Sequence, residues 1–418
     1  MVTRKAVRRP RLVWHAADIG GVPLLAVNHD VLSWNATDPH NSYVLVEKVP
    51  GQADQYRDVT GTSFTPAPVS GKVVSFSVRS ASSADGWADE VSIGYPAAGA
   101  GASAAAAAAS PFAVGLVAGS ELNSQIGYMQ LVGARTARLE FSIDAPLSRI
   151  APIVASYADS GIRPLLLASF DGRLPSPAEA QSLGNWAAAL GPGGTYWNSR
   201  NNPGNDAVTD IEFGNETSDS YQFSNNSPSA YAARARTYAL RARAAANAIR
   251  NANPRVGLLA IADNSQQGDT WVTQMFRAVP NLSSLVAGWT VHPYGPTWAA
   301  HIHNTIDSTA AAGGAARVPI WVTEFGLATD NGRCLSDNYG FSPCMTYAAA
   351  GQALQSVLSG MRTTFGGRIG GVYLFQASDQ QPTGTSSNRE SYFGALQADG
   401  SPKGAYTAAV EAGLAGIG

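Results

Sequence analysis

The chain has 418 residues, of which 45% are hydrophobic and 14% are charged, and its formal net charge is −2. This composition favours a large buried core over global disorder, and the length fits one large catalytic domain with a small module. The near-neutral charge gives no electrostatic footprint for nucleic acid or an anionic membrane, and no apolar run is long enough to cross a bilayer.

The N-terminal third is expected to hold a tail, a small β-sandwich and a linker. Residues 1–10 are basic and predict a solvated, disordered tail, and because no apolar signal core follows them, a signal peptide is expected to be absent from this sequence. Residues 11–96 contain short alternating or β-branched runs separated by Gly, Pro, Asn and Asp, which predict a sandwich with Trp34 and Phe76 in its core. Residues 97–110 are rich in Ala and Gly and predict a linker.

Residues 111–418 alternate short apolar runs with helical segments, the pattern of βα units around a parallel sheet. Ser176 before Pro177 predicts the start of one helix, and the Ala- and Arg-rich run 229–252 predicts another. An open doubly wound sheet is the alternative, but no G-x-G-x-x-G follows the first strand. The fold class is therefore predicted to be α/β, a (β/α)8 TIM barrel preceded by a small all-β sandwich. Its eight strands are expected to start near Pro111, Thr136, Ile162, Val208, Val256, Val286, Val318 and Gly370.

Two glutamates follow apolar strands on opposite sides of the predicted barrel. Glu216 ends the fourth strand and Glu324 ends the seventh. Active sites of such barrels lie at the C-terminal ends of the strands, so these carboxyl groups can face each other across a bound sugar. Retaining glycoside hydrolysis needs one carboxyl group as acid/base and one as nucleophile. We therefore predict that Glu216 is the acid/base and Glu324 the nucleophile.

Four further residues are expected to organise this pair. Tyr294 is placed to hydrogen-bond Glu324, and Asn215 to donate to the sugar 2-hydroxyl. Glu212 lies four residues before Glu216 on one strand, so both point into the barrel, and a buried carboxylate needs a partner. Arg138 is the candidate partner, and its role stays open between that ion pair and the orientation of Glu324.

Other residues are weaker candidates. His292 either contacts substrate or is a satisfied core histidine, and Trp298 either stacks on a sugar or packs in its loop. Gln376 and Asp379 at the end of the eighth strand are expected to bind substrate, with a turn cap as the alternative for Asp379. No metal and no cofactor are expected. Cys334 and Cys344 are predicted to form a disulfide, which suggests an oxidising, extracellular setting.

The ordered motifs resemble a known clan. Asn215-Glu216 in DIEFGNE and Glu324 in WVTEFG match the signature of the (β/α)8 retaining glycoside hydrolases whose catalytic carboxylates follow strands 4 and 7. VHPYG, GPGGTYW and the closing YFGALQADGSPKGAY are similar to members of families 39 and 5, and Arg138 in TARLEF stands where the clan commonly has an arginine. Gly214-Asn215-Glu216 resembles the form found in families 51 and 79. The run LSWNATDPHNSYVLVEKV resembles the early strands of a fibronectin type III domain.

The sequence thus predicts an extracellular, secreted or cell-surface, retaining glycoside hydrolase that cleaves a poly- or oligosaccharide. It is expected to be a monomer, with no nucleic-acid partner and no membrane insertion. A non-catalytic carbohydrate-binding protein on a degenerate barrel is the alternative. A third reading makes the sandwich the functional binder and the barrel its support.

Overall fold

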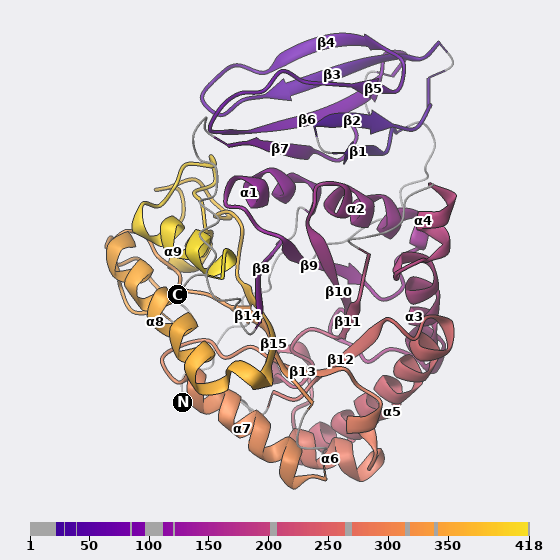
Figure 1. Cartoon of the computed structure of the whole chain (residues 1–418), viewed down its shortest axis with the longest axis vertical. Helices are drawn as coiled ribbons and strands as arrows, with labels where there is room; N and C mark the ends of the chain where they lie inside the picture. The colour runs from indigo at the N-terminus through magenta and orange to yellow at the C-terminus, as the bar shows by residue number, and fades with distance from the viewer. Residues whose placement is uncertain are drawn as a thin grey trace.

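The computed structural model describes residues 22–28, 30–38, 40–83, 86–96, 112–119, 122–200, 207–263, 270–313, 318–337 and 342–416. The predicted tail at 1–10 and the predicted linker at 97–110 lie outside these residues. Two units fill the structure, a β-sandwich at the top of Figure 1 and a ring of strands and helices below it.

The sandwich consists of two antiparallel sheets, in the orders β1-β2-β5 and β4-β3-β6-β7. Buried and more exposed side chains alternate along β1 and β2, as the sequence pattern predicts, whereas all five residues of β7 are buried because this strand also packs on the barrel. Trp34 and Phe76 are both buried in the sandwich, and Trp34 packs edge-on against Tyr43 with ring centroids 5.5 Å apart. The strands are β1 (Leu25–Asn28), β2 (Val31–Trp34), β3 (Ser42–Lys48), β4 (Gln55–Thr60), β5 (Ser63–Phe64), β6 (Lys72–Ser80) and β7 (Val91–Tyr95).

The second unit is a closed barrel of eight parallel strands in the order β8 to β15, with β15 paired to β8. All eight predicted strands are present, so the predicted (β/α)8 fold is confirmed. Parallel strands that are covered on the outside by helices are apolar along most of their length, which is why the sequence shows apolar runs here. The strands are β8 (Ala113–Val117), β9 (Thr136–Ser142), β10 (Arg163–Ser169), β11 (Asp210–Phe213), β12 (Gly257–Ile261), β13 (Gly288–Val291), β14 (Ile320–Phe325) and β15 (Ile369–Leu374).

Three of the longer helices around the barrel start at side-chain caps, at Ser176, Ser227 and Thr346. Ser176 accepts a hydrogen bond from the backbone of Glu179, whose side chain accepts one from the Ser176 backbone, and Pro177 occupies the first turn. The helices are α1 (Gln125–Leu131), α2 (Leu147–Asp159), α3 (Pro177–Leu190), α4 (Thr195–Ser199), α5 (Pro228–Ala252), α6 (Thr270–Ala278), α7 (Trp298–Ala311), α8 (Tyr347–Phe365) and α9 (Ala405–Leu414). Short 3-10 turns lie at Leu122–Ser124, Ser220–Gln222, Leu282–Ser284, Gly366–Arg368 and Arg389–Tyr392.

The sandwich packs directly on α1 and α2 of the barrel (Figure 1). The approach of β7 to α1 is very close, because a Cβ on Gly94 would lie 2.1 Å from the Gly127 carbonyl oxygen. Ser92 Oγ donates to the Ser124 carbonyl oxygen and accepts the Gly127 N–H, while the Gly94 N–H donates to Gln130 Oε1. One buried apolar cluster runs from the sandwich into the barrel. The two units are therefore packed as one body.

The segment between β14 and α8 carries the predicted disulfide. Cys334 and Cys344 are bonded, with their Cα atoms 5.0 Å apart, so this prediction is confirmed. Arg389 donates to the carbonyl oxygens of Leu335 and Ser342, which ties the same segment to the loop that follows β15. No helix in the described part of the chain combines the length and apolarity that crossing a bilayer requires.

Candidate active site

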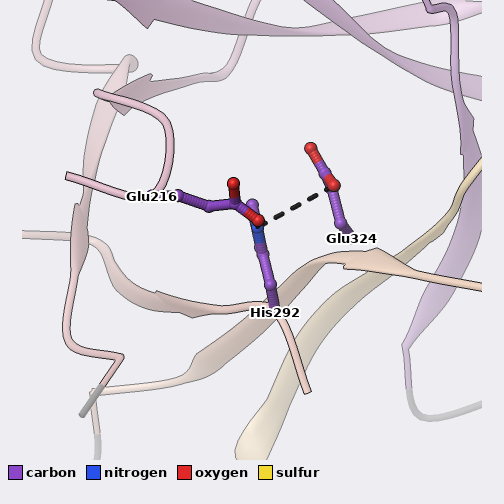
Figure 2. A group of neighbouring side chains, drawn as sticks. All are labelled: Glu216, His292 and Glu324. Atoms are coloured by element: carbon purple, nitrogen blue, oxygen red, sulfur yellow. Dashed lines mark hydrogen bonds and ion pairs between the residues drawn. The ribbon is translucent and has the colours of Figure 1, made fainter. Parts of the chain in front are cut away.

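Glu216 and Glu324 converge at the mouth of the barrel, where β11 and β14 end. Three atoms lie within 4.8 Å of one another: a carboxylate oxygen of Glu216, a carboxylate oxygen of Glu324 and a ring nitrogen of His292 (Figure 2). Carboxyl groups of retaining glycosidases are about 5–5.5 Å apart, whereas those of inverting enzymes are about 6.5–9.5 Å apart to admit a water. The observed spacing falls on the retaining side.

The turn after β11 aims Glu216 over the mouth. Gly214 and Glu216 both have left-handed backbones, with φ of 85° and 45°. A Cβ on Gly214 would lie 2.5 Å from Phe170 Cε2 and from Thr217 Oγ1, so only glycine fits here. A non-glycine residue at positive φ is strained, and such strain often marks a functional position.

Both oxygens of Glu324 are held by hydrogen bonds. Arg138 Nη1 donates to Glu324 Oε1 at 2.7 Å, and the Tyr294 hydroxyl donates to Oε2 at 2.9 Å. Arg138 Nε donates to Glu212 Oε2 at 2.5 Å, and its Nη2 donates to Asn215 Oδ1 at 2.9 Å. The two roles left open for Arg138 therefore occur together. This buried guanidinium fixes the nucleophile candidate, its neighbouring carboxylate and the amide of Asn215.

Glu212 stays ionised although it is buried. Burial by itself raises the pKa of Glu212, but the charge and hydrogen bond of Arg138 and the nearby ring of His292, whose Nε2 is 3.9 Å from Glu212 Oε1, outweigh burial and leave this pKa below its ordinary value. Its second oxygen, Oε1, accepts the Thr323 hydroxyl at 2.7 Å. Glu212 is thus a buried anion that holds Arg138 and Thr323 in place beside the two candidate catalytic carboxyl groups.

Glu216 has a different environment. Its Oε1 lies 3.0 Å from His292 Nδ1, and its Oε2 is buried with no hydrogen-bond partner among the described residues. The spacing of Glu216, His292 and Glu324 would also suit three metal ligands. Because Arg138 and Tyr294 already donate to Glu324, the arrangement favours acid–base chemistry between two carboxyl groups.

Comparisons with known proteins agree with this geometry. Residues 194–358 match the family model described as the glycosyl hydrolase catalytic core. Glu216 and Glu324 both lie inside the matched residues, so this part of the barrel is similar to the catalytic core of glycosyl hydrolases. The predicted resemblance to the retaining clan is therefore confirmed at that level. The curated proteins give no match to the chain.

Several solved structures are similar to the chain at low sequence identity. A family 39 glycoside hydrolase from Bacteroides cellulosilyticus WH2 is 14% identical, with 90% of this chain and 77% of that chain covered and a TM-score of 0.48. The GH53 catalytic domain of Ignisphaera aggregans is 13% identical, with 73% and 96% covered and a TM-score of 0.50. Bacteroides uniformis β-glucuronidase 2 is 11% identical, with 94% and 50% covered and a TM-score of 0.49, so this chain spans half of its length. At such identities these likenesses reach no further than the fold.

Asp379 and Trp298, two candidate substrate contacts, have protein partners in the structure. Asp379 was expected to bind a sugar, but its side chain is 1% exposed and its Oδ1 accepts Lys403 Nζ at 2.7 Å. Burial raises the pKa of Asp379 to about 6 against the opposing charge of Lys403. Trp298 begins α7 and packs edge-on against Phe365 of α8, with centroids 6.2 Å apart, so it covers a helix interface.

Gln376 follows β15 and is 5% exposed. Its backbone N–H donates to the Phe393 carbonyl oxygen and its own carbonyl accepts the Ala395 N–H. Its side-chain oxygen faces Gly119, at 2.8 Å from where a Cβ would stand. Substrate contact by Gln376 therefore stays a prediction, with only a small exposed part to make it.

The sequence reasoning gave no role to Thr323. Strand alternation would turn Thr323 away from the face that Glu324 occupies, yet both side chains reach the site. The pairing of β14 with β15 shifts register between Val322 and Phe325, and this irregularity re-aims the strand end. Asp263 was also missed, and its Oδ2 accepts the backbone N–H of His292 at 3.1 Å.

Proposed function

We propose that the chain hydrolyses glycosidic bonds of a poly- or oligosaccharide with retention, using Glu324 as nucleophile and Glu216 as acid/base. The observation that carries this proposal is the convergence of the two carboxyl groups within 4.8 Å. The asymmetry of their surroundings assigns the roles. Glu324 accepts donors at both oxygens, which favours its anion, whereas no described residue hydrogen-bonds Glu216 Oε2.

In the first step a Glu324 oxygen attacks the anomeric carbon while the bond from that carbon to the leaving oxygen breaks. The proton on Glu216 Oε2 passes to the leaving oxygen, so Glu324 becomes a neutral glycosyl ester and Glu216 becomes a carboxylate. Arg138 and Tyr294 hold the attacking carboxylate in one orientation, which reduces the entropy cost of reaching the transition state.

In the second step Glu216 takes a proton from water, and the water oxygen attacks the anomeric carbon. The ester bond to Glu324 breaks, the carboxylate is restored and the sugar leaves with its original configuration. Asn215 supports both steps. Because Arg138 occupies Asn215 Oδ1, the amide N–H groups are left to donate to the sugar 2-hydroxyl, a contact that strengthens in the transition state.

The test compares Glu324→Gln and Glu216→Gln with the exposed control Glu411→Gln on α9. A polysaccharide panel with analysis of reducing ends first finds the substrate, and NMR of the fresh product then reports its anomeric configuration. We expect retention, a loss of turnover of several orders of magnitude in both site variants, and wild-type turnover in the control. Near-normal turnover of Glu324→Gln in a folded protein would refute the assignment.

The alternative is a carbohydrate-binding protein on a barrel that has lost catalysis. The presence of both carboxyl groups, with their supporting donors, argues against this reading. Binding of glycans with no release of reducing ends from any member of the panel would favour it.

We further propose that residues 11–96 form a fibronectin type III-like module fused to a catalytic domain at 111–418. Its three- and four-stranded sheets, with the orders β1-β2-β5 and β4-β3-β6-β7, support a sandwich of this kind. The close packing of Gly94 on Gly127 supports a structural role for the module. Deletion of residues 1–96 should therefore lower stability, whereas a free binding module would leave the hydrolysis of small soluble glycosides and the melting temperature unchanged.

We also propose that the protein acts outside the cell as a monomer. The disulfide supports an oxidising compartment. Detection of the protein in a culture supernatant, and a single species near 43 kDa in light scattering, would agree with this proposal. Retention in the cell or a stable dimer would contradict it.

A further inference from the structure

His292, just after β13, lies between the two carboxyl groups to which the proposed function gives the catalytic roles, and the inference below rests on that function. Its Nδ1 is 3.0 Å from Glu216 Oε1 and 3.9 Å from Glu324 Oε2 (Figure 2). Its Nε2 is 3.0 Å from Thr323 Oγ1, and its side chain is 7% exposed. Both ring nitrogens are therefore engaged.

The hydrogen on Nε2 follows from the partners of Thr323. A threonine hydroxyl has one hydrogen, and here that hydrogen points to Oε1 of ionised Glu212, which only accepts. Towards His292, Thr323 Oγ1 can then only accept. His292 Nε2 must carry a hydrogen.

The hydrogen on Nδ1 follows from the demands on Glu216. If Nδ1 had no hydrogen, Glu216 Oε1 would have to donate its acidic proton to the histidine, and Oε2 would have none for a leaving group. If Nδ1 carries a hydrogen, it donates to Oε1 and the acidic proton resides on Oε2, the oxygen to which no residue in the described part of the chain is hydrogen-bonded. Only the second arrangement leaves Glu216 ready to act as an acid.

Charged groups around the ring agree with that arrangement. Burial alone lowers the pKa of His292, but the negative charge of Glu324, the Glu212 carboxylate at 3.9 Å and the hydrogen bond to Glu216 raise this pKa well above 6.5. Carboxyl groups face the residue from β11 and its following turn, from the end of β12 and from β14, and Arg138 on β9 is the cation paired with two of them. These carboxyl groups belong to Glu212, Glu216, Asp219, Asp263 and Glu324, and the Tyr294 hydroxyl lies beside them.

We propose that His292 is a positioning residue that stays an imidazolium throughout the reaction, with Thr323 and Glu212 fixing its direction. During glycosylation the negative charge leaves Glu324, which becomes an ester, and appears on Glu216, which gives up its proton. Because His292 Nδ1 lies beside both carboxyl groups, the imidazolium stabilises the negative charge on Glu324 before this step and on Glu216 after it. No histidine movement or proton uptake is required.

The test measures the protonation of His292 in the full-length protein without substrate. ¹⁵N-histidine labelling and long-range ¹H–¹⁵N NMR distinguish an imidazolium from either neutral tautomer, and loss of one signal set in His292→Gln assigns it among the six histidines. At pH 8 an ordinary histidine is only about 3% protonated. We expect both His292 nitrogens to carry hydrogen at that pH. A neutral ring there would overturn the inference, even if the enzyme proves to be a retaining hydrolase.

Thr323→Val and Thr323→Ser form a matched pair, because the serine keeps the hydroxyl. The valine variant should lower the titration midpoint of His292 by about one pH unit, a tenfold change in its protonation constant. The alkaline limb of its kcat/KM profile should move down with the midpoint, while the serine variant follows the wild type. A merely packed threonine would lower stability without moving either. Equal midpoints in all three proteins would contradict the role of Thr323.

Since the NMR measurement needs no substrate, it separates this inference from the proposed function. If Glu324→Gln is fully active, the function fails whatever the histidine does. If turnover is lost as expected and the ring is neutral at pH 8, only the inference fails.

Discussion

Replacing Arg138 by methionine should damage both the stability and the activity of the enzyme. Arg138 is 1% exposed and donates to Glu212, Glu324 and Asn215. Methionine fills a similar volume but leaves two buried carboxylates close together without their counter-charge. Arg138→Lys keeps the charge, yet one ammonium lacks the planar fork that reaches three acceptors, so this variant should be intermediate.

The expected size follows from burial. Removing one partner of a buried ion pair costs roughly 3–5 kcal/mol. With an unfolding entropy of about 2.1 cal/mol/K per residue, a chain of 418 residues that unfolds as one body has a melting temperature lowered by about 3–6 °C. Misorientation of Glu324 should lower kcat/KM by about 100-fold or more, because displacements near 1 Å have such effects.

Differential scanning calorimetry and initial-rate kinetics would check these values, with Arg173→Met as the matched control. Arg173 pairs with Glu179 at 2.5 Å but is 45% exposed, so its loss should cost no more than about 1 kcal/mol. If Arg138→Met has the same melting temperature as Arg173→Met and keeps the wild-type kcat/KM, the buried guanidinium does not organise the site. If Arg138→Met lowers the melting temperature but not kcat/KM, the role of Arg138 is limited to its ion pair with Glu212.

Three further predictions concern stability. Gly94→Ala should lower the melting temperature, because the new methyl group meets the Gly127 carbonyl oxygen at 2.1 Å, while Gly367→Ala, which meets nothing within 4 Å, should not; equal melting would show that the sandwich is not docked as described. The raised pKa of His292 gives stability that is complete below pH 6.5 and is lost as pH rises through the folded-state value, so thermal melts of His292→Gln should decline less steeply above pH 7, and parallel declines would speak against the imidazolium. Replacing Cys334 by serine opens an 11-residue loop and should cost about 3 kcal/mol, with reductant changing the melting of the wild type and not of the variant.

The local pattern was sufficient to predict the fold. Each barrel strand is an apolar run because it is buried on both sides, and three of the long helices begin at a side-chain cap such as Ser176 with Pro177. Glu216 and Glu324 could be singled out because a carboxyl group that ends a buried parallel strand must lie at the mouth of the barrel. The predicted support from Tyr294 and Arg138 follows the same logic of strand ends.

The failures have a common cause. Asp379 also ends a barrel strand, but whether it faces the substrate depends on Lys403, which is 24 residues away in the chain and fills the space beside it. For Trp298 the sequence left sugar stacking and loop packing open, and the structure packs its ring against Phe365 of α8. A single sequence reveals no partner at such a separation, so side-chain assignments of this kind require the packed structure.

The amino-acid sequence by itself determined which segments are strands and helices and which two acids stand at strand ends, because burial period, caps and turn residues act over a few neighbouring positions. Only the tertiary structure decided which charged groups pair and which groups hydrogen-bond. In it Arg138 pairs with two carboxylates, and a register shift turns Thr323 inward, where it accepts the hydrogen bond from His292. Hydrogen-bond direction and charge pairing depend on distances of about 3 Å between residues far apart in the chain, and the closure of the barrel sets those distances.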